Sequence, residues 1–108
     1  MKVLRPSDVA PEVVNTGKVV VFITSTHCHA CHELSKIFYE FRAIAGDDVT
    51  MIHVHEGEDP DPRRYTPGVT QIRGWPFTII YRDGKIKELW YGITTVQEYY
   101  ERLKGGLA

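Results

Sequence analysis

The sequence has few cysteines, no long apolar run and no excess of charge of either sign. Its 108 residues include two cysteines, 13 basic and 14 acidic side chains, with a formal net charge of -1. A chain so close to neutral lacks the basic face that nucleic-acid binding requires, so we expect no nucleic-acid partner. No apolar run approaches the ~20 residues of a membrane span, and residues 1–8 lack the ~7–15-residue apolar stretch of a signal peptide. We therefore expect a cytoplasmic protein without membrane contacts.

The length and composition fit one domain of ordinary size. The chain is 43% hydrophobic and 25% charged, as globular proteins are, and its length leaves no room for a second core. We expect a single domain over residues 1–108 and a monomer. Cys28 and Cys31 are three positions apart, and a bridge closing so short a loop restricts the unfolded chain little. The pair therefore indicates chemistry rather than stabilisation.

Three segments in the first half of the chain predict strands, and the shortest of them is Val3-Leu4. Residues 19–23 are a continuous β-branched and aromatic run, which is typical of a strand buried in the middle of a sheet. Residues 49–55 alternate in character, so that His53 and His55 fall on the same side of a strand. We interpret these two histidines as surface side chains rather than ligands.

Two segments in the first half predict helices. Ser7 is placed to cap a short helix that ends near Val14. A longer helix follows Cys31, and Gly46 is placed to end it. The apolar positions of this second helix fall on one face, as in a helix packed on a sheet; they are Leu34, Ile37, Phe38, Phe41, Ile44 and Ala45.

A polar connection and a hairpin follow in the second half. Residues 56–68 are rich in proline and acidic side chains, and we interpret the acidic part as a solvated loop. Residues 77–81 and 86–91 are strand-like, and Asp83-Gly84 lies between them. Asp-Gly between two such runs is a strong indication of a β-hairpin.

A last helix completes the order of elements. Thr95 and Glu98 form a capping box at its start, and Gly105 and Gly106 are placed to close it. One β-α-β crossover followed by a hairpin and a helix predicts a mixed sheet covered on both faces. The expected fold class is therefore α/β.

The two cysteines follow a strand and a short loop at the start of the predicted helix. Residues three positions apart are neighbours on a helix, so the two sulfurs can close a disulfide. The free N–H groups and the positive end of the helix dipole favour the thiolate of the first cysteine, and thiolate is the attacking species in disulfide exchange. We therefore predict that Cys28 is the nucleophile and that Cys31 displaces the mixed disulfide.

The sequence resembles the thioredoxin family along nearly its whole length. The matching pieces are a buried strand, the Cys-x-x-Cys pair, a Gly-x-Pro segment, a hairpin and a glycine before the last helix, at residues 19–23, 28–31, 72–77, 81–85 and 92. The resemblance implies the thioredoxin fold, a central mixed sheet flanked by helices on both faces. It also implies thiol-disulfide oxidoreductase activity, with no cofactor beyond a redox-active disulfide between Cys28 and Cys31.

The resemblance implies how substrates bind as well. Members of the family carry a cis-proline beside the active disulfide, which is Pro76 here, preceded by Gly74 and Trp75. The Trp75 backbone would pair with an extended substrate segment, and such pairing demands little of the substrate's sequence. We expect protein disulfides as substrates, contacts from His27 beside the nucleophile, and an electron donor that resembles thioredoxin reductase.

Several positions depart from the usual family pattern. His27 stands where tryptophan is usual before the first cysteine, and His29-Ala30 replaces Gly-Pro between the cysteines. Phe22 replaces a buried carboxylate six residues before the nucleophile, and Phe77 replaces the threonine after the cis-proline. The usual proton relay therefore lacks its carboxylate, and we expect a histidine to serve instead.

Three histidines crowd the sulfurs, namely His27, His29 and His32. An imidazolium beside Cys28 favours the thiolate, and a stabilised reduced form makes a disulfide couple more oxidising. We therefore assign His29 a catalytic role and expect a better oxidant than a thioredoxin with Gly-Pro between its cysteines.

Two alternatives use the same part of the chain. The thiols and imidazoles of residues 27–32 are enough in number for tetrahedral zinc or copper, but adjacent residues seldom converge on one ion, so we expect no metal. A glutaredoxin-like protein would grip glutathione with a Gly-Gly pair before the last helix, where Gly92-Ile93-Thr94-Thr95 stands. This difference favours a protein over glutathione as the electron donor.

Overall fold

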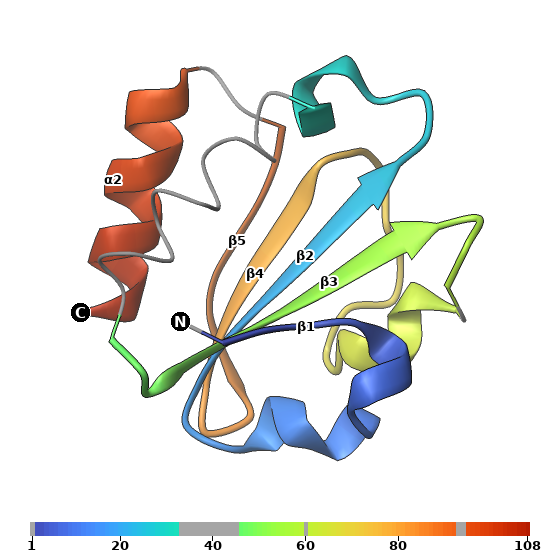
Figure 1. Ribbon diagram of the computed structural model, residues 1–108. Coiled ribbons are helices and arrows are strands. Elements are labelled where there is room, and N and C mark those ends of the chain that lie inside the picture. Colours follow the sequence, from blue (N-terminus) through green and yellow to red (C-terminus); the bar gives the residue numbers. More distant parts are fainter. Residues whose placement is uncertain (1, 33–45, 60, 93–94) are drawn as a thin grey trace.

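A five-stranded mixed sheet forms the centre of the computed structural model, which describes residues 2–32, 46–59, 61–92 and 95–108 (Figure 1). The strands lie side by side in the order β1-β3-β2-β4-β5. Their bounds are β1 Lys2–Leu4, β2 Lys18–Ser25, β3 Val49–Glu56, β4 Phe77–Arg82 and β5 Lys85–Tyr91. The continuous apolar run predicted to be a central strand is β2, and six of its eight residues are buried.

The pairing of β2 with β3 and β4 determines which strand ends lie together. β2 runs parallel to β3, with Phe22 opposite His53 and Thr24 opposite His55, and antiparallel to β4. Parallel strands bring their carboxyl ends to the same edge of the sheet, and binding sites in α/β proteins are found beyond such ends. The loop that carries the cysteines starts at that edge.

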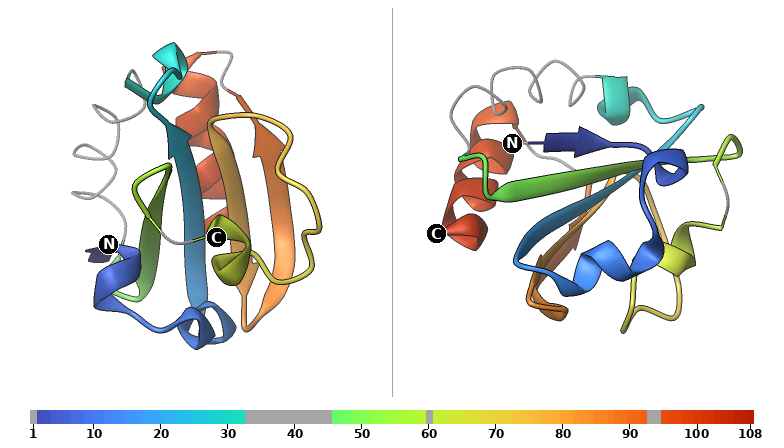
Figure 2. Two further views of the ribbon diagram at one scale, coloured as in Figure 1. Left: turned by 90° about the vertical axis from the view of Figure 1, so that its right-hand side faces the viewer. Right: turned by 60° about the horizontal axis from the view of Figure 1, so that its bottom comes forward.

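Each face of the sheet has its own apolar layer, and Figure 2 shows helical segments on both faces. Helix α2, Val96–Leu107, packs on one face against Val20, Phe22 and Met51. The short 3-10 helices η2, Pro11–Asn15, and η3, Pro62–Tyr65, lie on the other face. No helix in the described ranges is long and apolar enough to cross a membrane.

The N-terminal helix predicted from Ser7 to Val14 is wrong. The segment forms two 3-10 helices, η1 Pro6–Asp8 and η2, with Ala10 in extended conformation between them. Pro11 is the cause, since proline lacks the N–H that a continuous helix would use and disfavours helical backbone in the residue before it.

The helix predicted after Cys31 is described only at its start. Residues 29–32 are α-helical, so the helix begins directly after Cys28. Its predicted apolar face, from Leu34 to Ala45, lies outside the described residues.

The hairpin and the cap of the last helix are confirmed. Asp83 and Gly84 connect β4 to β5 with φ values of 51° and 84°, and a two-residue turn with both φ values positive matches the right-handed twist of the strands it joins. The Thr95 hydroxyl accepts the Glu98 N–H at 3.1 Å, as the capping box predicts.

The end of the last helix differs from the prediction. Gly105 and Gly106 do not stop α2, which continues to Leu107 and buries that side chain. A Cβ at position 106 would overlap Cδ1 of Ile80, whereas a Cβ at position 105 would meet nothing within 4 Å. Glycine is therefore required at position 106, because the helix approaches β4 closely there.

These two adjacent glycines give a matched test of helix packing. Gly106→Ala should lower the free energy of unfolding by about 1–3 kcal/mol, because the added methyl group overpacks the core at Ile80. Gly105→Ala should raise it by about 0.5–1 kcal/mol, since alanine favours the helix and nothing obstructs its methyl group. Urea unfolding of both variants measures the difference, and equal changes of the same sign would contradict the packing.

Candidate active site

Cys28 and Cys31 form a disulfide at the junction between β2 and the following helix. The strand ends at Ser25, and the Cys28 N–H donates to the Ser25 carbonyl at 3.2 Å, which closes a tight turn. The two Cα atoms are 5.3 Å apart, within the usual range for a disulfide. The turn therefore places Cys28 at the position that caps the helix.

The sulfur of Cys28 occupies the place of a helix-capping oxygen. Its Sγ accepts the N–H of Cys31 at 3.1 Å. A capping side chain normally accepts this N–H with oxygen, because the first N–H groups of a helix have no partner within it. In the reduced protein the same N–H and the helix dipole would face the Cys28 sulfur and favour its negative charge.

The two sulfurs differ in access. Cys28 is half-buried and lines an open pocket of about 470 Å³, whereas Cys31 is 7% exposed and does not line it. The other residues that line this pocket are Ser25, His27, His29, Ala30 and Trp75. A substrate can therefore approach Cys28 directly, while Cys31 is reached through its partner.

The Gly-Trp-Pro segment borders the same pocket. The Trp75–Pro76 peptide bond is cis, and the Pro76 carbonyl accepts the Gly92 N–H at 2.7 Å. Among the described residues, none hydrogen-bonds the backbone N–H or carbonyl of Trp75, whose side chain is 40% exposed. Gly74 is half-buried, and a Cβ there would touch the Tyr91 ring. The segment thus offers a backbone edge beside the disulfide.

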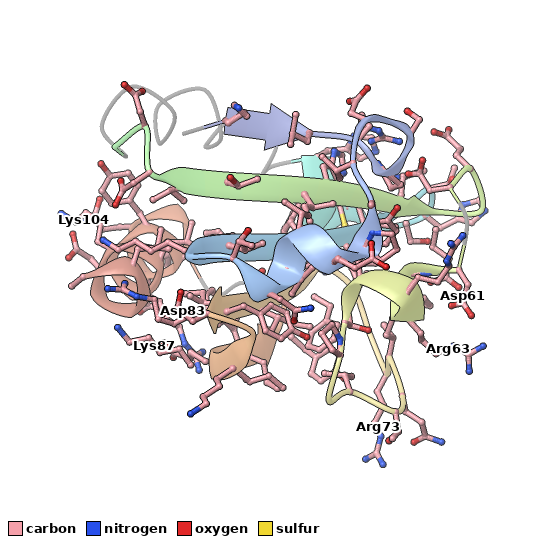
Figure 3. The ribbon with its side chains drawn as sticks, turned by 90° about the horizontal axis from the view of Figure 1, so that it is seen from below. Asp61, Arg63, Arg73, Asp83, Lys87 and Lys104 are labelled. Carbon is pink, nitrogen blue, oxygen red and sulfur yellow. A yellow bond between two sulfur atoms is a disulfide. The ribbon has the colours of Figure 1, made fainter. Side chains whose placement is uncertain are left out.

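A second open pocket, of about 530 Å³, lies on the other side of Trp75. Its walls carry charge from Glu56, Asp61, Arg63 and Arg73, and Figure 3 shows the last three at one end of the molecule. Arg63 binds the Asp61 carboxylate through its Nε and Nη2 atoms at 2.8–3.1 Å, which lowers the pKa of Asp61. The indole of Trp75 lines both pockets.

The three histidines of the Cys-x-x-Cys segment are all exposed. His27 and His29 line the pocket of Cys28, whereas His32 does not. Within the part of the chain that the structure describes, no three His, Cys, Asp or Glu side chains are grouped so that they could hold a metal ion.

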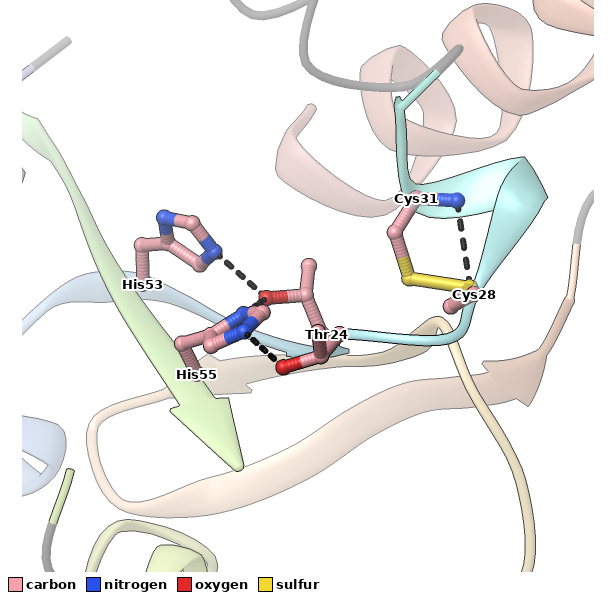
Figure 4. The surroundings of a disulfide bond; sticks show 6 residues. Thr24, Cys28, Cys31, His53 and His55 are labelled. Atoms are coloured by element: carbon pink, nitrogen blue, oxygen red, sulfur yellow. Dashed lines mark hydrogen bonds between the residues drawn. A yellow bond between two sulfur atoms is a disulfide. The ribbon is translucent and has the colours of Figure 1, made fainter. Parts of the chain in front are cut away.

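His53 and His55 are half-buried, so the prediction that they are ordinary surface side chains is wrong. Both bind the hydroxyl of Thr24, His53 through Nε2 at 2.8 Å and His55 through Nδ1 at 2.6 Å. Thr24 is 4% exposed, and the His53 ring packs against Phe22. Figure 4 shows Thr24 between the two histidines and the disulfide. Thr24 pairs with His55 across β2 and β3, and no local sequence pattern indicates this pairing.

Burial and a nearby cation keep His53 neutral. Burial is the largest cause, followed by the charges of Arg5 and His55, and together they lower the pKa of His53 from 6.5 to about 4 against an opposing effect of Asp59. The Arg5 Nη1 atom lies 3.2 Å from Nδ1 of His53. Because a guanidinium can only donate, Nδ1 is the accepting nitrogen of this ring.

The acidic loop after β3 is not wholly solvated, contrary to prediction. The Asp59 carboxylate binds Nη2 of Arg5 at 2.7 Å and accepts the backbone N–H of His55 at 2.6 Å. The Asp59 side chain is only 13% exposed. This carboxylate therefore holds Arg5 against the histidine cluster.

The comparison with solved structures identifies the fold. No protein-family model and no curated protein matches the sequence. The structure is similar to a thioredoxin of Malassezia sympodialis, Mala s 13, with a TM-score of 0.73 over the whole of this chain and 92% of that one, at 17% sequence identity. The chain has the thioredoxin fold, and its Cys28–Cys31 disulfide fits a Cys-x-x-Cys site. The fold expected from the sequence is confirmed.

The neutral state of His53 predicts a loss of stability in acid. Between pH 6.5 and about 4 the unfolded chain binds a proton at His53 that the folded chain does not, so the free energy of unfolding falls as the pH falls. At about 1.4 kcal/mol per pH unit, the contribution is roughly 3 kcal/mol.

Urea unfolding at pH 7 and pH 4 measures this contribution. His53→Gln removes the titrating ring and should lose less stability over the interval than the unchanged chain does. His32→Gln removes an exposed histidine and should lose as much as the unchanged chain. Equal losses in all three proteins would show that His53 is not held neutral.

Proposed function

We propose that the chain is a thiol-disulfide oxidoreductase acting on protein disulfides. The observation that supports this best is the difference between its two bonded sulfurs. Cys28 Sγ caps a helix start in an open pocket, and Cys31 is buried behind it. The thioredoxin fold is consistent with the same activity. A structural disulfide of so short a span would add little stability.

The proposed reaction has two exchange steps. The Cys28 thiolate attacks one sulfur of a substrate disulfide, which forms a mixed disulfide and releases the other substrate sulfur as a thiolate. Cys31 then loses its proton and attacks Cys28 Sγ, which releases the second substrate thiolate and restores the Cys28–Cys31 bond. Two electrons pass to the substrate, and an external dithiol returns them.

The surroundings of Cys28 favour an extended polypeptide as substrate. The Trp75 N–H and carbonyl have no partner among the described residues, so a peptide strand can bind them beside the sulfur. His27 and His29 form part of the same pocket wall. We propose a protein dithiol, of the kind that thioredoxin reductase supplies, as the electron donor.

Reduction of insulin tests the activity directly. With dithiothreitol present, the protein should accelerate precipitation of the insulin B chain well above the rate with dithiothreitol alone. Turbidity measures the reaction, and Cys28→Ser should abolish the acceleration. Elemental analysis of the purified protein decides separately whether residues 27–32 hold zinc or copper.

The two cysteines should trap substrates differently. Cys31→Ser leaves the attacking thiolate but removes the thiol that resolves the mixed disulfide, so covalent complexes with disulfide proteins should accumulate. Cys28→Ser should trap none, because the buried Cys31 sulfur does not reach the pocket. Non-reducing electrophoresis shows the complexes, and equal trapping by both variants would overturn the assigned roles.

We infer further that the couple is more oxidising than that of a thioredoxin with Gly-Pro between its cysteines. His27 and His29 lie in the pocket of Cys28, where a protonated ring favours the thiolate and hence the reduced form. In a two-electron couple, each 1.4 kcal/mol of such preference raises the potential by about 30 mV.

His29→Ala should therefore lower the midpoint potential. The ring is exposed, so solvent weakens its effect, and we expect a decrease of about 5–20 mV. Equilibration with glutathione measures the potential. His32→Ala is the matched control, since His32 does not line the pocket, and it should change the potential less. A potential that rises in His29→Ala would contradict the role of this ring.

A further inference from the structure

A chain of side-chain hydrogen bonds runs beneath the loop that carries Cys28. It starts at Arg5 and passes through His53, Thr24 and His55 to Thr26, with donor–acceptor distances between 2.6 and 3.2 Å. The members come from three separate segments: the residue before η1, the end of β2 with its following turn, and β3.

Arg5 determines the direction of this chain. A guanidinium only donates, so Nδ1 of His53 accepts and the hydrogen of that ring is on Nε2. The Nε2–H then donates to the Thr24 oxygen, and the Thr24 hydroxyl donates its own hydrogen to Nδ1 of His55. His55 consequently carries its hydrogen on Nε2, which donates to Thr26. Every bond in the chain points from Arg5 toward the disulfide loop.

The two histidines differ in their capacity for a second proton. A proton on Nδ1 of His53 would face the Arg5 guanidinium at 3.2 Å. A proton on Nδ1 of His55 would face the Thr24 oxygen, which has two lone pairs and can accept from both rings once its own hydrogen turns away. The neutral state of His53, with its pKa lowered to about 4, agrees with this difference.

Acidic groups lie on the His55 side of the chain. A Glu58 carboxylate oxygen is 4.0 Å from Nε2 of His55, and the Asp59 carboxylate accepts the His55 backbone N–H. Among the described residues, the charged groups that face the chain are thus Arg5 and Asp59, which are paired with each other, and Glu58 on the His55 side. The Arg5 charge disfavours a proton on His53, whereas a Glu58 carboxylate oxygen faces Nε2 of His55.

We propose that His55 takes up a proton when the Cys28–Cys31 disulfide is reduced and releases it when the disulfide forms again. His55 and Thr24 are paired at the carboxyl end of β2, four residues before Cys28, and Figure 4 shows Thr24 between the histidines and the disulfide. Reduction creates a negative charge on the Cys28 sulfur at the end of this same loop, and the nearby base compensates it. His55 acts on Cys28 through its charge and does not touch substrate.

The step balances with a dithiol as the reductant and rests on the proposed function. The dithiol gives two electrons to the Cys28–Cys31 bond, which breaks, and becomes a disulfide itself. Of its two protons, one goes to Cys31 and the other reaches His55, with the exposed Thr26 at the outer end of the chain. Cys28 remains a thiolate, and no proton is released to solvent. Without His55 as acceptor, one proton leaves.

The equilibrium of the disulfide with dithiothreitol, measured at several pH values, distinguishes these cases. If a proton is released, the equilibrium constant for reduction rises about tenfold per pH unit. With His55 as acceptor the equilibrium constant should change by less than about threefold per pH unit near pH 7. In His55→Gln the equilibrium constant should rise by the full factor of about ten per pH unit.

Variants at Thr24 separate proton uptake from packing. Thr24→Val keeps the branched shape but removes the oxygen that would accept Nδ1–H of a charged His55. Its equilibrium constant for reduction should therefore rise steeply with pH, as in His55→Gln. Thr24→Ser keeps the oxygen, so its equilibrium constant should change with pH as little as that of the unchanged chain. Equal slopes in the unchanged chain and His55→Gln, whether steep or shallow, would overturn the proposal.

A second measurement uses the unchanged chain alone and covers the case of a variant that fails to fold. Nitrogen-15 chemical shifts of the histidine rings at pH 7 should show His55 with hydrogen on Nε2 only in the oxidised protein and on both nitrogens after reduction. Identical His55 shifts in the two redox states would overturn the proposal. Neither measurement needs a protein substrate, so a failure to reduce insulin would affect only the proposed function.

Discussion

The hydrogen bond from the Cys31 N–H to the Cys28 sulfur is the contact on which the site depends. It exists because β2 ends at Ser25 and the chain turns at once into a helix, so that a sulfur stands where a capping oxygen usually does. The turn gives the two cysteines different surroundings although only two residues separate them. One sulfur faces an open pocket and the other faces the interior.

Much of this arrangement could be predicted because it depends on local pattern. The apolar run of β2, the Asp83-Gly84 turn and the Thr95 cap are each specified by a few adjacent residues, and each is found in the structure. Two helix predictions are wrong. Pro11 interrupts the first helix through its own backbone geometry, and the end of α2 depends on a distant strand. Gly106 looks like a helix terminator, but Ile80 on β4 requires a glycine there.

The histidine cluster could not be predicted from alternation alone. His53 and His55 fall on the same strand face as the buried Met51, so alternation predicts which face of the sheet they occupy. It does not predict their hydrogen-bond partners. Thr24 and Arg5 are remote in sequence, and only the parallel register of β2 with β3 brings Thr24 between the rings. Thr24 is buried and the two histidines are half-buried here because each polar group satisfies the next.

Arg5 lies outside the sheet, yet it determines which nitrogen of an interior ring carries hydrogen. Its other terminal nitrogen is bound to Asp59, so one side chain joins the beginning of the chain to the turn after β3. In related proteins, a change at the position of Arg5 alone can therefore alter the pKa of the residue at the position of His53. Neither the cysteines nor the strands beneath them would need to change in the course of that evolution.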